Sequence, residues 1–494
     1  MKKKMGWERV VSLQELEHKK SALFKKDTKH IAVFKVGQDI WAIDNRCPHQ
    51  GYPLVQGTVD ACVLTCNWHS WKFDMRTGKC LTGGDPVRVY PTKVEESFIW
   101  VDVAEPSKEE RMQTILEGLK TAFTKAKYGR TSREVARLYF NGLDPTVAIQ
   151  KSIEWSYERL KEGTTHAYAA CADWLRLYFE NISNPENQLI CITEAIDHMA
   201  DDAWGQSLYP YSKEAEPFSE EAWIAAIEAE DEKKAIALLQ GALGAGLHFK
   251  QLEKVFTRAA LMHYNDFGHA LIYVTKAGTV IEFLGEAIER PILLSLTRAL
   301  CHMTREDLLP EFQDTSKYAS QNSYDALLEM NAKNFLYFNS HFEAAYDKPV
   351  SDNVSWLDFT HPITFANAVR VQCQKYPEFW KQGLLQLSFF QGRNIPYVDT
   401  AQNVSSWTVK NKDQFFSECV EKILDHGIND RIQVAHLLKT FCAVREEVAH
   451  AQNVTIQKLL LAALNRYFHS PIKFKHVRRA ARQNMRLVGK DFQH

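Results

Sequence analysis

Two short segments near the start of the chain each hold one cysteine and one histidine, and they constrain the fold more than any other feature. The segments are Cys47-Pro-His49 and Cys66-Asn-Trp-His69, with residues 50–65 between them. In one type of [2Fe–2S] cluster, one iron takes two thiolates and the other takes two imidazoles. Each segment can reach both irons if the two lie at hairpin tips that face each other. The same side chains also suit a structural zinc ion, although zinc fingers seldom use Cys-x-His as their first pair.

The residues around these segments are typical of β-strands. Apolar and polar residues alternate over 30–44 and 87–103, and short turns separate the runs. The alternation then stops, and Ser107 with the glutamate three residues later has the spacing of a helix capping box. Helical periodicity dominates from there onward. We therefore predict a multidomain protein, with a small antiparallel all-β domain over 1–104 and a large all-α domain over 105–494.

The stretch from Cys66 to Gly78 resembles the second ligand loop of Rieske ferredoxins and Rieske oxygenases, and the resemblance covers about residues 6–103. Ser70 stands where this family usually has glycine. High-potential respiratory Rieske proteins join the two ligand loops by a disulfide, but Tyr52 and Asn67 occupy those positions here. The resemblance thus implies electron transfer at a ferredoxin-like potential, toward the ~ −150 mV end of the Rieske range. It implies a Rieske [2Fe–2S] cluster with four ligands, which are Cys47, His49, Cys66 and His69.

Charge and hydropathy exclude several classes of partner. The 494 residues carry a formal net charge of −1, so no global positive field attracts nucleic acid. No apolar run approaches the ~18 residues that a membrane-spanning helix needs, and the lysine-rich start lacks the apolar segment of a secretory signal. The ten cysteines are scattered and do not resemble a disulfide framework. We expect a protein of the reduced cytoplasm.

In the helical part, two histidines lie close together in the sequence, His263 and His269. On a continuous helix, residues at this spacing point about 120° away from each other and cannot bind one metal ion. Asn265 and Gly268 favour a break between them, which lets the two imidazoles converge. Tyr273 follows His269 by one helical turn and shares its face.

A second segment, residues 361–370, begins with His361 before a proline. Proline suits the first position of a helix, so the pattern predicts His361 at the N-cap, where the helix dipole keeps an imidazole neutral. This segment and residues 269–273 resemble the two histidine-containing helices of the questin oxidase-like family, α-helical proteins linked to oxidative ring cleavage, and His166 resembles that family's early histidine. The resemblance implies an oxidative site. We expect catalytic roles for His269, His361 and Tyr273, and a second iron centre, if the domain holds one, at His263, His269 and His361.

Two further kinds of iron site can be tested against the sequence. A ring-hydroxylating Rieske oxygenase needs an Asp/Glu-x-x-His-x-x-x-x-His motif, and the chain has none. A di-iron carboxylate site could use Glu447 and His450, which have the i, i+3 spacing of such helical bundles. Glu194 and His198 share a helix face and could also chelate a metal ion.

We predict an oxygenase-like oxidoreductase that acts on an unknown small molecule. Electrons would come from a separate NAD(P)H-dependent reductase or a ferredoxin, pass through the cluster and reach the oxidative site of the helical domain. The chain has no Gly-x-Gly-x-x-Gly or Walker-type motif, so we do not expect it to oxidise NAD(P)H itself. The alternative is an electron carrier whose helical domain is a docking scaffold for another enzyme.

Overall fold

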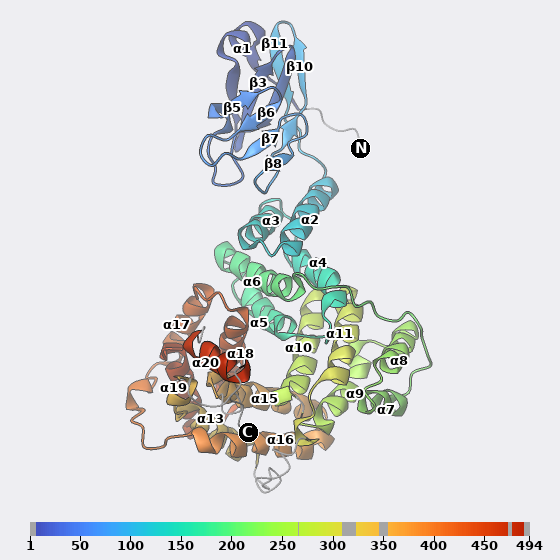
Figure 1. The fold of residues 1–494 in the computed structure, drawn as a ribbon, viewed down its shortest axis with the longest axis vertical. Coiled ribbons are helices and arrows are strands. Elements are labelled where there is room, and N and C mark those ends of the chain that lie inside the picture. The colour runs from blue at the N-terminus through green and yellow to red at the C-terminus, as the bar shows by residue number, and fades with distance from the viewer. Residues whose placement is uncertain (1–5, 265, 309–322, 345–353, 473–476, 489–494) are drawn as a thin grey trace. The chain divides into compact units, whose positions relative to one another are not determined.

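A β-sheet part is followed by a large helical part (Figure 1), which confirms the predicted fold class. The structure is a computed structural model, and it describes residues 6–264, 266–308, 323–344, 354–472 and 477–488. None of the described helices is both long and apolar enough to cross a bilayer.

The last strand of the β part ends at Asp102 and the first long helix begins at Lys108. The compact units do not divide at residue 104, however. One unit, here called the β unit, is Met1–Ala122 with Ala136–Leu143, and the other, the helical unit, is Phe123–Val135 with Asp144–His494. The β unit thus includes helical residues beyond the strands.

The described strands of the β unit form three antiparallel sheets. Their strand orders are β1-β11-β10, β2-β3-β4-β9 and β5-β6-β7-β8. The two predicted cluster loops follow β4 and β6, so each begins at a strand end. The elements are β1 (Trp7–Ser12), α1 (Leu13–Lys19), β2 (Ser21–Lys26), β3 (Lys29–Val36), β4 (Asp39–Asp44), β5 (Thr58–Asp60), β6 (Val63–Thr65), β7 (Lys72–Asp74), β8 (Cys80–Thr82), β9 (Val89–Tyr90), β10 (Thr92–Glu95) and β11 (Phe98–Asp102).

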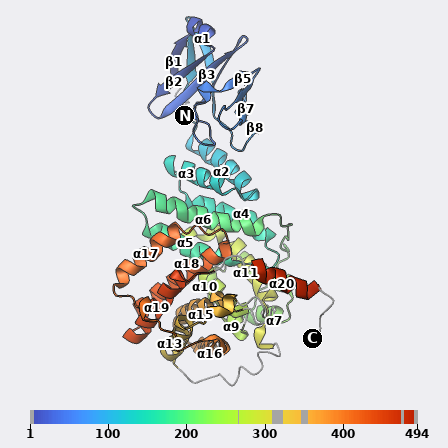
Figure 2. The ribbon, with the colours of Figure 1, turned by 60° about the vertical axis from the view of Figure 1, so that its left-hand side comes forward.

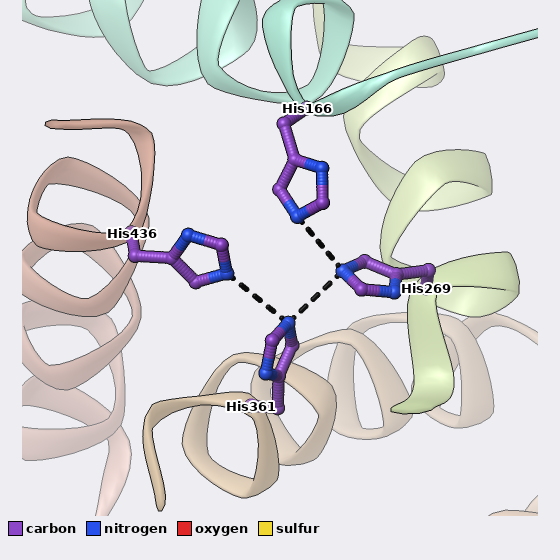
Figure 3. Close-up of side chains that lie close together, drawn as sticks. All are labelled: His166, His269, His361 and His436. Atoms are coloured by element: carbon purple, nitrogen blue, oxygen red, sulfur yellow. Dashed lines mark hydrogen bonds between the residues drawn. The ribbon is translucent and has the colours of Figure 1, made fainter. Parts of the chain in front are cut away.

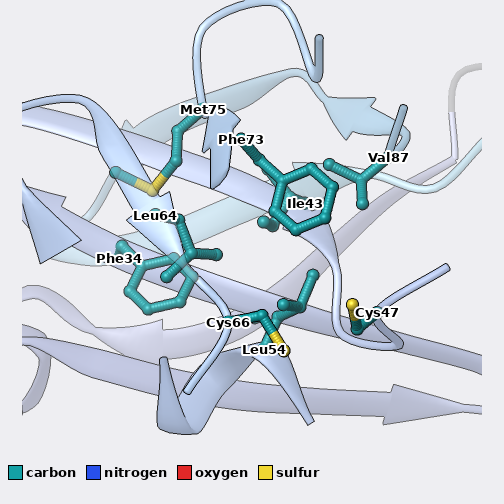
Figure 4. Close-up of a cluster of buried hydrophobic side chains, with 10 residues drawn as sticks. Phe34, Ile43, Cys47, Leu54, Leu64, Cys66, Phe73, Met75 and Val87 are labelled. Atoms are coloured by element: carbon teal, nitrogen blue, oxygen red, sulfur yellow. The ribbon is translucent and has the colours of Figure 1, made fainter. Parts of the chain in front are cut away.

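The two cysteines of the cluster loops belong to a hydrophobic core. Figure 4 shows Cys47 and Cys66 near Leu54, and the same core contains Leu64 and Phe73, all of them buried. Complete burial of an aliphatic or aromatic side chain stabilises a fold by roughly 1.5–3 kcal/mol. The packing of this core therefore holds the start of both loops in place.

Helix α2 (Lys108–Thr124) begins at the predicted capping box. Glu110 N–H donates to Ser107 Oγ at 3.1 Å, and Ser107 N–H donates to the Glu110 carboxylate at 2.9 Å. These two bonds satisfy N–H groups that have no partner inside the helix. The prediction of a helix start at Ser107 is confirmed.

Helices account for most of the described residues after α2. They are α3 (Tyr128–Phe140), α4 (Thr146–Ser156), α5 (His166–Glu180), α6 (Pro185–Ala203), α7 (Glu220–Glu228), α8 (Glu232–Gly244), α9 (Phe249–Met262), α10 (His269–Leu284), α11 (Glu289–His302), α13 (Tyr324–Leu336), α14 (His341–Ala344), α15 (Trp356–Lys375), α16 (Trp380–Asn394), α17 (Lys412–Leu424), α18 (Arg431–His450), α19 (Val454–His469) and α20 (Val477–Val488).

Four of these helices close a ring inside the helical unit. Helix α5 packs against α10 and α18, and α15 packs against the same two helices. Figure 2 shows the four helices close together. Each of them carries one histidine that points into the ring.

Candidate functional site

The two cluster loops share one backbone framework. In each loop the cysteine N–H donates to the carbonyl five residues later, and the N–H four residues later donates to the cysteine carbonyl. The distances are 2.9 and 2.7 Å at Cys47 and 2.8 and 2.9 Å at Cys66. The residue four positions after the cysteine has a left-handed backbone in both loops, with φ of 79° at Gly51 and 58° at Ser70. Ser70 therefore adopts a conformation for which glycine is the usual residue.

The imidazoles of these loops lie next to each other. The rings of His49 and His69 meet edge to face with centroids 4.5 Å apart, and His49 also stacks on Trp71 at 4.7 Å. His49 Nδ1 is buried and has no hydrogen-bond partner among the described residues. Burial and the neighbouring Cys66 raise the pKa of the Cys47 thiol to about 11. Two buried sulfurs and a buried ring nitrogen without a partner are donors that fit an iron–sulfur cluster.

A second group of donors lies in the helical unit, and we call it the four-histidine site (His166, His269, His361 and His436; Figure 3). Its members come from α5, α10, α15 and α18, the four helices of the ring. The Nε2 atoms are 3.0 Å apart between His166 and His269, 2.9 Å between His269 and His361, and 3.2 Å between His361 and His436. One nitrogen from each ring lies within 4.8 Å of those of the other three. This spacing brings all four within reach of one metal ion.

Main-chain carbonyls fix the tautomer of three of these rings. In His269, His361 and His436, Nδ1 donates to the carbonyl three or four residues earlier, at 2.5, 2.7 and 2.7 Å. A carbonyl can only accept, so Nδ1 carries the proton of the neutral ring and Nε2 presents a lone pair. Lone pairs that face one another at these distances repel. A cation between them converts this repulsion into attraction.

Burial keeps three of these imidazoles neutral. It lowers the pKa of His166, His361 and His436 well below the ordinary value, and the nearby Lys439 and the other histidines act in the same direction. Lys439 is itself buried, its amine has no hydrogen-bond partner within the described part of the chain, and burial lowers its pKa to about 7. Lys439 can therefore lose its proton near neutral pH, which removes a positive charge next to the site.

A strained turn sets the position of His269. The two residues before Gly268 have φ of 43° and 53°, and Gly268 itself has φ of 78°. A Cβ on Gly268 would lie only 2.5 Å from the ring of Phe365, so a larger residue does not fit. The helix break predicted before His269 is therefore confirmed, although Asn265 lies outside the described residues.

His263 is not part of the four-histidine site, so its assignment to a second iron centre is wrong. Its Nδ1 is 2.9 Å from the Asp307 carboxylate and its Nε2 is 3.0 Å from the Glu228 carboxylate. Although burial opposes it, the two carboxylates raise the pKa of His263. The helix break turns His263 toward α7, so that of these two histidines His269 alone faces the ring. There His269 and His361 are joined by His166 and His436.

His361 lies inside α15, so the prediction that it is an N-cap is also wrong. The N-cap is Ser355, whose N–H donates to the Asp358 carboxylate at 2.8 Å. Pro362 has no N–H to offer the Asp358 carbonyl, and Asn394 Nδ2 donates to that carbonyl instead, at 2.8 Å. A side chain from α16 thus lets the helix continue through the proline. Burial, rather than the helix dipole, keeps His361 neutral.

Tyr273 lies at the site, on the same helix as His269. Its hydroxyl is 3.4 Å from His166 Nδ1, and burial raises the pKa of Tyr273 well above the ordinary value, so the hydroxyl keeps its proton. Sequence reasoning missed His436. The signal that could have identified it is a histidine and a lysine, Lys439, one helical turn apart inside an apolar run.

The alternative chelating pairs do not form metal sites. Glu447 accepts a hydrogen bond from Arg370 at 2.8 Å, whereas His450 is exposed. Glu194 pairs with His426 at 3.1 Å. These carboxylates are therefore engaged in ion pairs, and within the described part of the chain neither pair belongs to a group of three or more convergent metal donors.

Comparison with known proteins identifies the β part. The family model of the Rieske [2Fe–2S] domain matches residues 6–91. The chain is 38% identical over 78 residues to the 3-phenylpropionate/cinnamic acid dioxygenase ferredoxin subunit of Shigella boydii, which is 15% of this chain and 74% of that protein. It is 31% identical over 99 residues to the anthranilate 1,2-dioxygenase ferredoxin subunit of Burkholderia cepacia, which is 20% of this chain and 92% of that protein.

Among solved structures, the ferredoxin of carbazole 1,9a-dioxygenase from Nocardioides aromaticivorans IC177 is 31% identical, over 20% of this chain and 97% of that one. The TM-score is 0.19, too low to support an inference about fold. The sequence matches confirm the Rieske resemblance and the [2Fe–2S] cluster as a cofactor. The resemblance of the helical part to questin oxidase-like proteins stays a prediction.

Proposed function

Because the chain belongs to the Rieske [2Fe–2S] family through its first hundred residues, we propose that it carries single electrons from an external donor to an oxidative site in its own helical unit. The observation that carries this proposal is the four-histidine site, a set of convergent imidazole donors in the same chain as the cluster domain. The donor is an NAD(P)H-dependent reductase or a ferredoxin. The acceptor is a small molecule that reacts at the four-histidine site.

The proposed ligands of the [2Fe–2S] cluster are Cys47, His49, Cys66 and His69. Each equivalent loop offers one buried thiol and one imidazole, which is the donor set that a Rieske cluster requires. When bound, such a cluster takes up and gives back one electron. Trp71 covers one face of the His49 ring and Trp68 is 57% exposed, so the imidazoles lie near the surface that a partner can reach.

The four-histidine site fits a first-row transition metal. Imidazole binds zinc, copper, iron and nickel, and hard cations such as Mg²⁺ prefer oxygen donors, which this set lacks. A one-electron supply from the cluster domain favours iron or copper over zinc, because zinc has no redox chemistry in proteins. At this position a redox-active ion would supply electron transfer to a bound substrate. His269 and His361 are the proposed central ligands, since each lies within about 3 Å of two neighbours.

Tyr273 is the proposed hydrogen-bond donor of the site. Its phenol stays protonated at neutral pH because it is buried. It lines the same cavity as His166, and its hydroxyl is 3.4 Å from Nδ1 of that ring. A phenol in this position can hold a proton for an oxygen atom that gains charge during the reaction.

The names of the relatives support an oxidative role. Both sequence relatives described above are named as ferredoxin subunits of dioxygenases, and such a subunit is an electron carrier. This chain differs because it continues into a large helical unit with its own convergent donors. We infer that the carrier and the acceptor site are fused here in one polypeptide.

The second candidate is an electron carrier with a docking scaffold. It is favoured by helix α20, on which Arg478 and Arg482 are exposed, since a basic surface helix attracts an acidic redox partner. In that case the four-histidine site would be unnecessary for turnover. Electrons would leave the chain for another enzyme.

Metal analysis of anaerobically purified full-length protein separates the two candidates. The preferred function predicts two irons and two acid-labile sulfides per chain for the cluster, and in addition one iron or copper ion per chain. Replacing His361 or His436 with alanine is expected to remove the additional ion and leave the Rieske EPR signal intact.

The matched control is His450→Ala, which removes an exposed histidine from the same helix as His436. It is expected to keep both centres. If the wild-type protein holds no metal beyond the cluster and His361→Ala reduces an acceptor enzyme as fast as wild type does, the carrier is the correct function.

A further inference from the structure

A cavity of about 420 Å³ lies against one edge of the four-histidine site. Its walls include Arg159, Lys161, Thr165, Asp202, Tyr273 and His302. Its volume falls in the usual range of ligand pockets, ~300–1,000 Å³. Of the four histidines, His166 alone lines this cavity within the described residues, while His269, His361 and His436 lie behind it.

His166 also differs from the others in how its ring is held. The other three rings are buried, with 2–6% of their surface exposed, and each donates Nδ1–H to a main-chain carbonyl. His166 is partly exposed, and within the described part of the chain its Nδ1 has one hydrogen-bond partner, the Tyr273 hydroxyl, at the long distance of 3.4 Å. It is the first residue of α5, so its backbone is at a helix end and not inside one. Its side chain is therefore the least constrained of the four.

We propose that His166 is the exchangeable ligand of the four-histidine site, and that the cavity delivers the small molecule that replaces it. His269, His361 and His436 keep the metal ion in place as a fixed triad. His166 turns into the cavity and frees one position for an incoming oxygen or nitrogen donor. This inference rests on the proposed function, because it requires a metal ion at the site.

The polar walls of the cavity indicate which molecules it takes. Arg159 and Lys161 place positive charge there, and Asp202 contributes a carboxyl that accepts a hydrogen bond from Thr165 at 2.6 Å. An apolar hydrocarbon would displace water from these charged groups without replacing the hydrogen bonds of that water. The cavity therefore suits a polar small molecule that presents an oxygen donor toward the metal and hydrogen-bonding groups toward the walls.

The test uses full-length protein loaded with cobalt(II), with azide as the incoming donor. Cobalt bands are recorded as a difference against the same variant loaded with zinc, which cancels the absorption of the iron–sulfur cluster. His166→Ala is expected to keep one cobalt per chain. It is expected to bind azide about tenfold more tightly than wild type, because no protein ligand has to leave. Free imidazole should compete with azide in this variant by filling the vacated space.

His361→Ala is the matched comparison, since it removes a ligand that a main-chain carbonyl anchors. It is expected to lose cobalt, while thermal melting followed by circular dichroism verifies that both variants fold. If His166→Ala unfolds, His166→Gln takes its place, because glutamine keeps most of the volume. The exchangeable role of His166 is overturned if His166→Ala loses cobalt as completely as His361→Ala does. It is also overturned if His166→Ala binds azide no more tightly than wild type. Failure of wild type to bind cobalt overturns the metal site itself.

Discussion

Replacing Ser70 with glycine should stabilise the β unit. Ser70 has φ of 58°, and its exposed side chain contributes no hydrogen bond recorded in the described structure. The left-handed conformation destabilises a non-glycine residue by roughly 1–2 kcal/mol. Glycine loses more backbone entropy on folding than alanine does, which costs about 0.5–1 kcal/mol. The central values of these two ranges leave a net gain of about 0.75 kcal/mol for glycine. For a unit of this size that is an increase of about 2–6 °C in melting temperature.

The assay is thermal loss of the visible circular dichroism of the cluster in full-length protein. Ser70→Ala is the control, because alanine keeps the strained backbone and removes only the hydroxyl. It should melt within about 0.5 kcal/mol of wild type, and the reduction potential of all three proteins should agree. Should Ser70→Gly melt below wild type, or should Ser70→Ala lose stability and change the potential, the hydroxyl and not the backbone would be the reason for serine at this position.

Three further outcomes are expected. Chelation should lower the melting temperature of wild type and of His450→Ala but not of His361→Ala. A metal ion at a thousandfold excess over its Kd contributes about 4 kcal/mol to the stability of the folded state. Equal shifts in all three proteins would contradict the metal site. Gly268→Ala should lower the free energy of unfolding by about 2–4 kcal/mol in chemical denaturation and reduce metal content, because it forces a Cβ toward Phe365 at a positive φ. In the control Gly244→Ala, the new Cβ meets no atom within 4 Å. This control should change the free energy of unfolding by less than about 1 kcal/mol. The pKa of His263 is raised in the folded state, so its pairing with Asp307 and Glu228 stabilises the fold below the unfolded pKa of about 6.5, and this stabilisation is lost as pH rises through the folded pKa. The melting temperature should therefore fall more between pH 5.5 and 8.5 in wild type than in His263→Gln. The same pH dependence in both proteins would contradict this pairing.

The parts of the molecule that depend on local chemistry could be predicted from sequence. Ser107 and Glu110 form a capping box because three residues bring a hydroxyl and a carboxylate to each other's N–H groups. The cluster loops are also local, since each carries its own cysteine and histidine. The helix break before His269 could be predicted because glycine tolerates a positive φ.

What could not be predicted depends on contacts between distant segments. His263 is nearer to His269 in sequence than any histidine of the site is, yet Asp307 and Glu228 hold it outside the site. His361 does not cap its helix because Asn394, far along the chain, satisfies the carbonyl that Pro362 leaves without a partner. His436 has no neighbour in the sequence that reveals its role, and only the packing of α18 against α5 and α15 does so.

Under the proposed function, the ring of α5, α10, α15 and α18 also limits when the chain can acquire the metal ion of the four-histidine site. Its four imidazoles come from four separate helices, and the last of them, His436, is made long after the first, His166. A ribosome-bound chain that ends before residue 436 lacks one of the three proposed fixed ligands, which are His269, His361 and His436. Charging with metal must therefore wait until nearly the whole helical unit has been translated and docked, whereas each cluster loop is complete within the first seventy residues or so of synthesis.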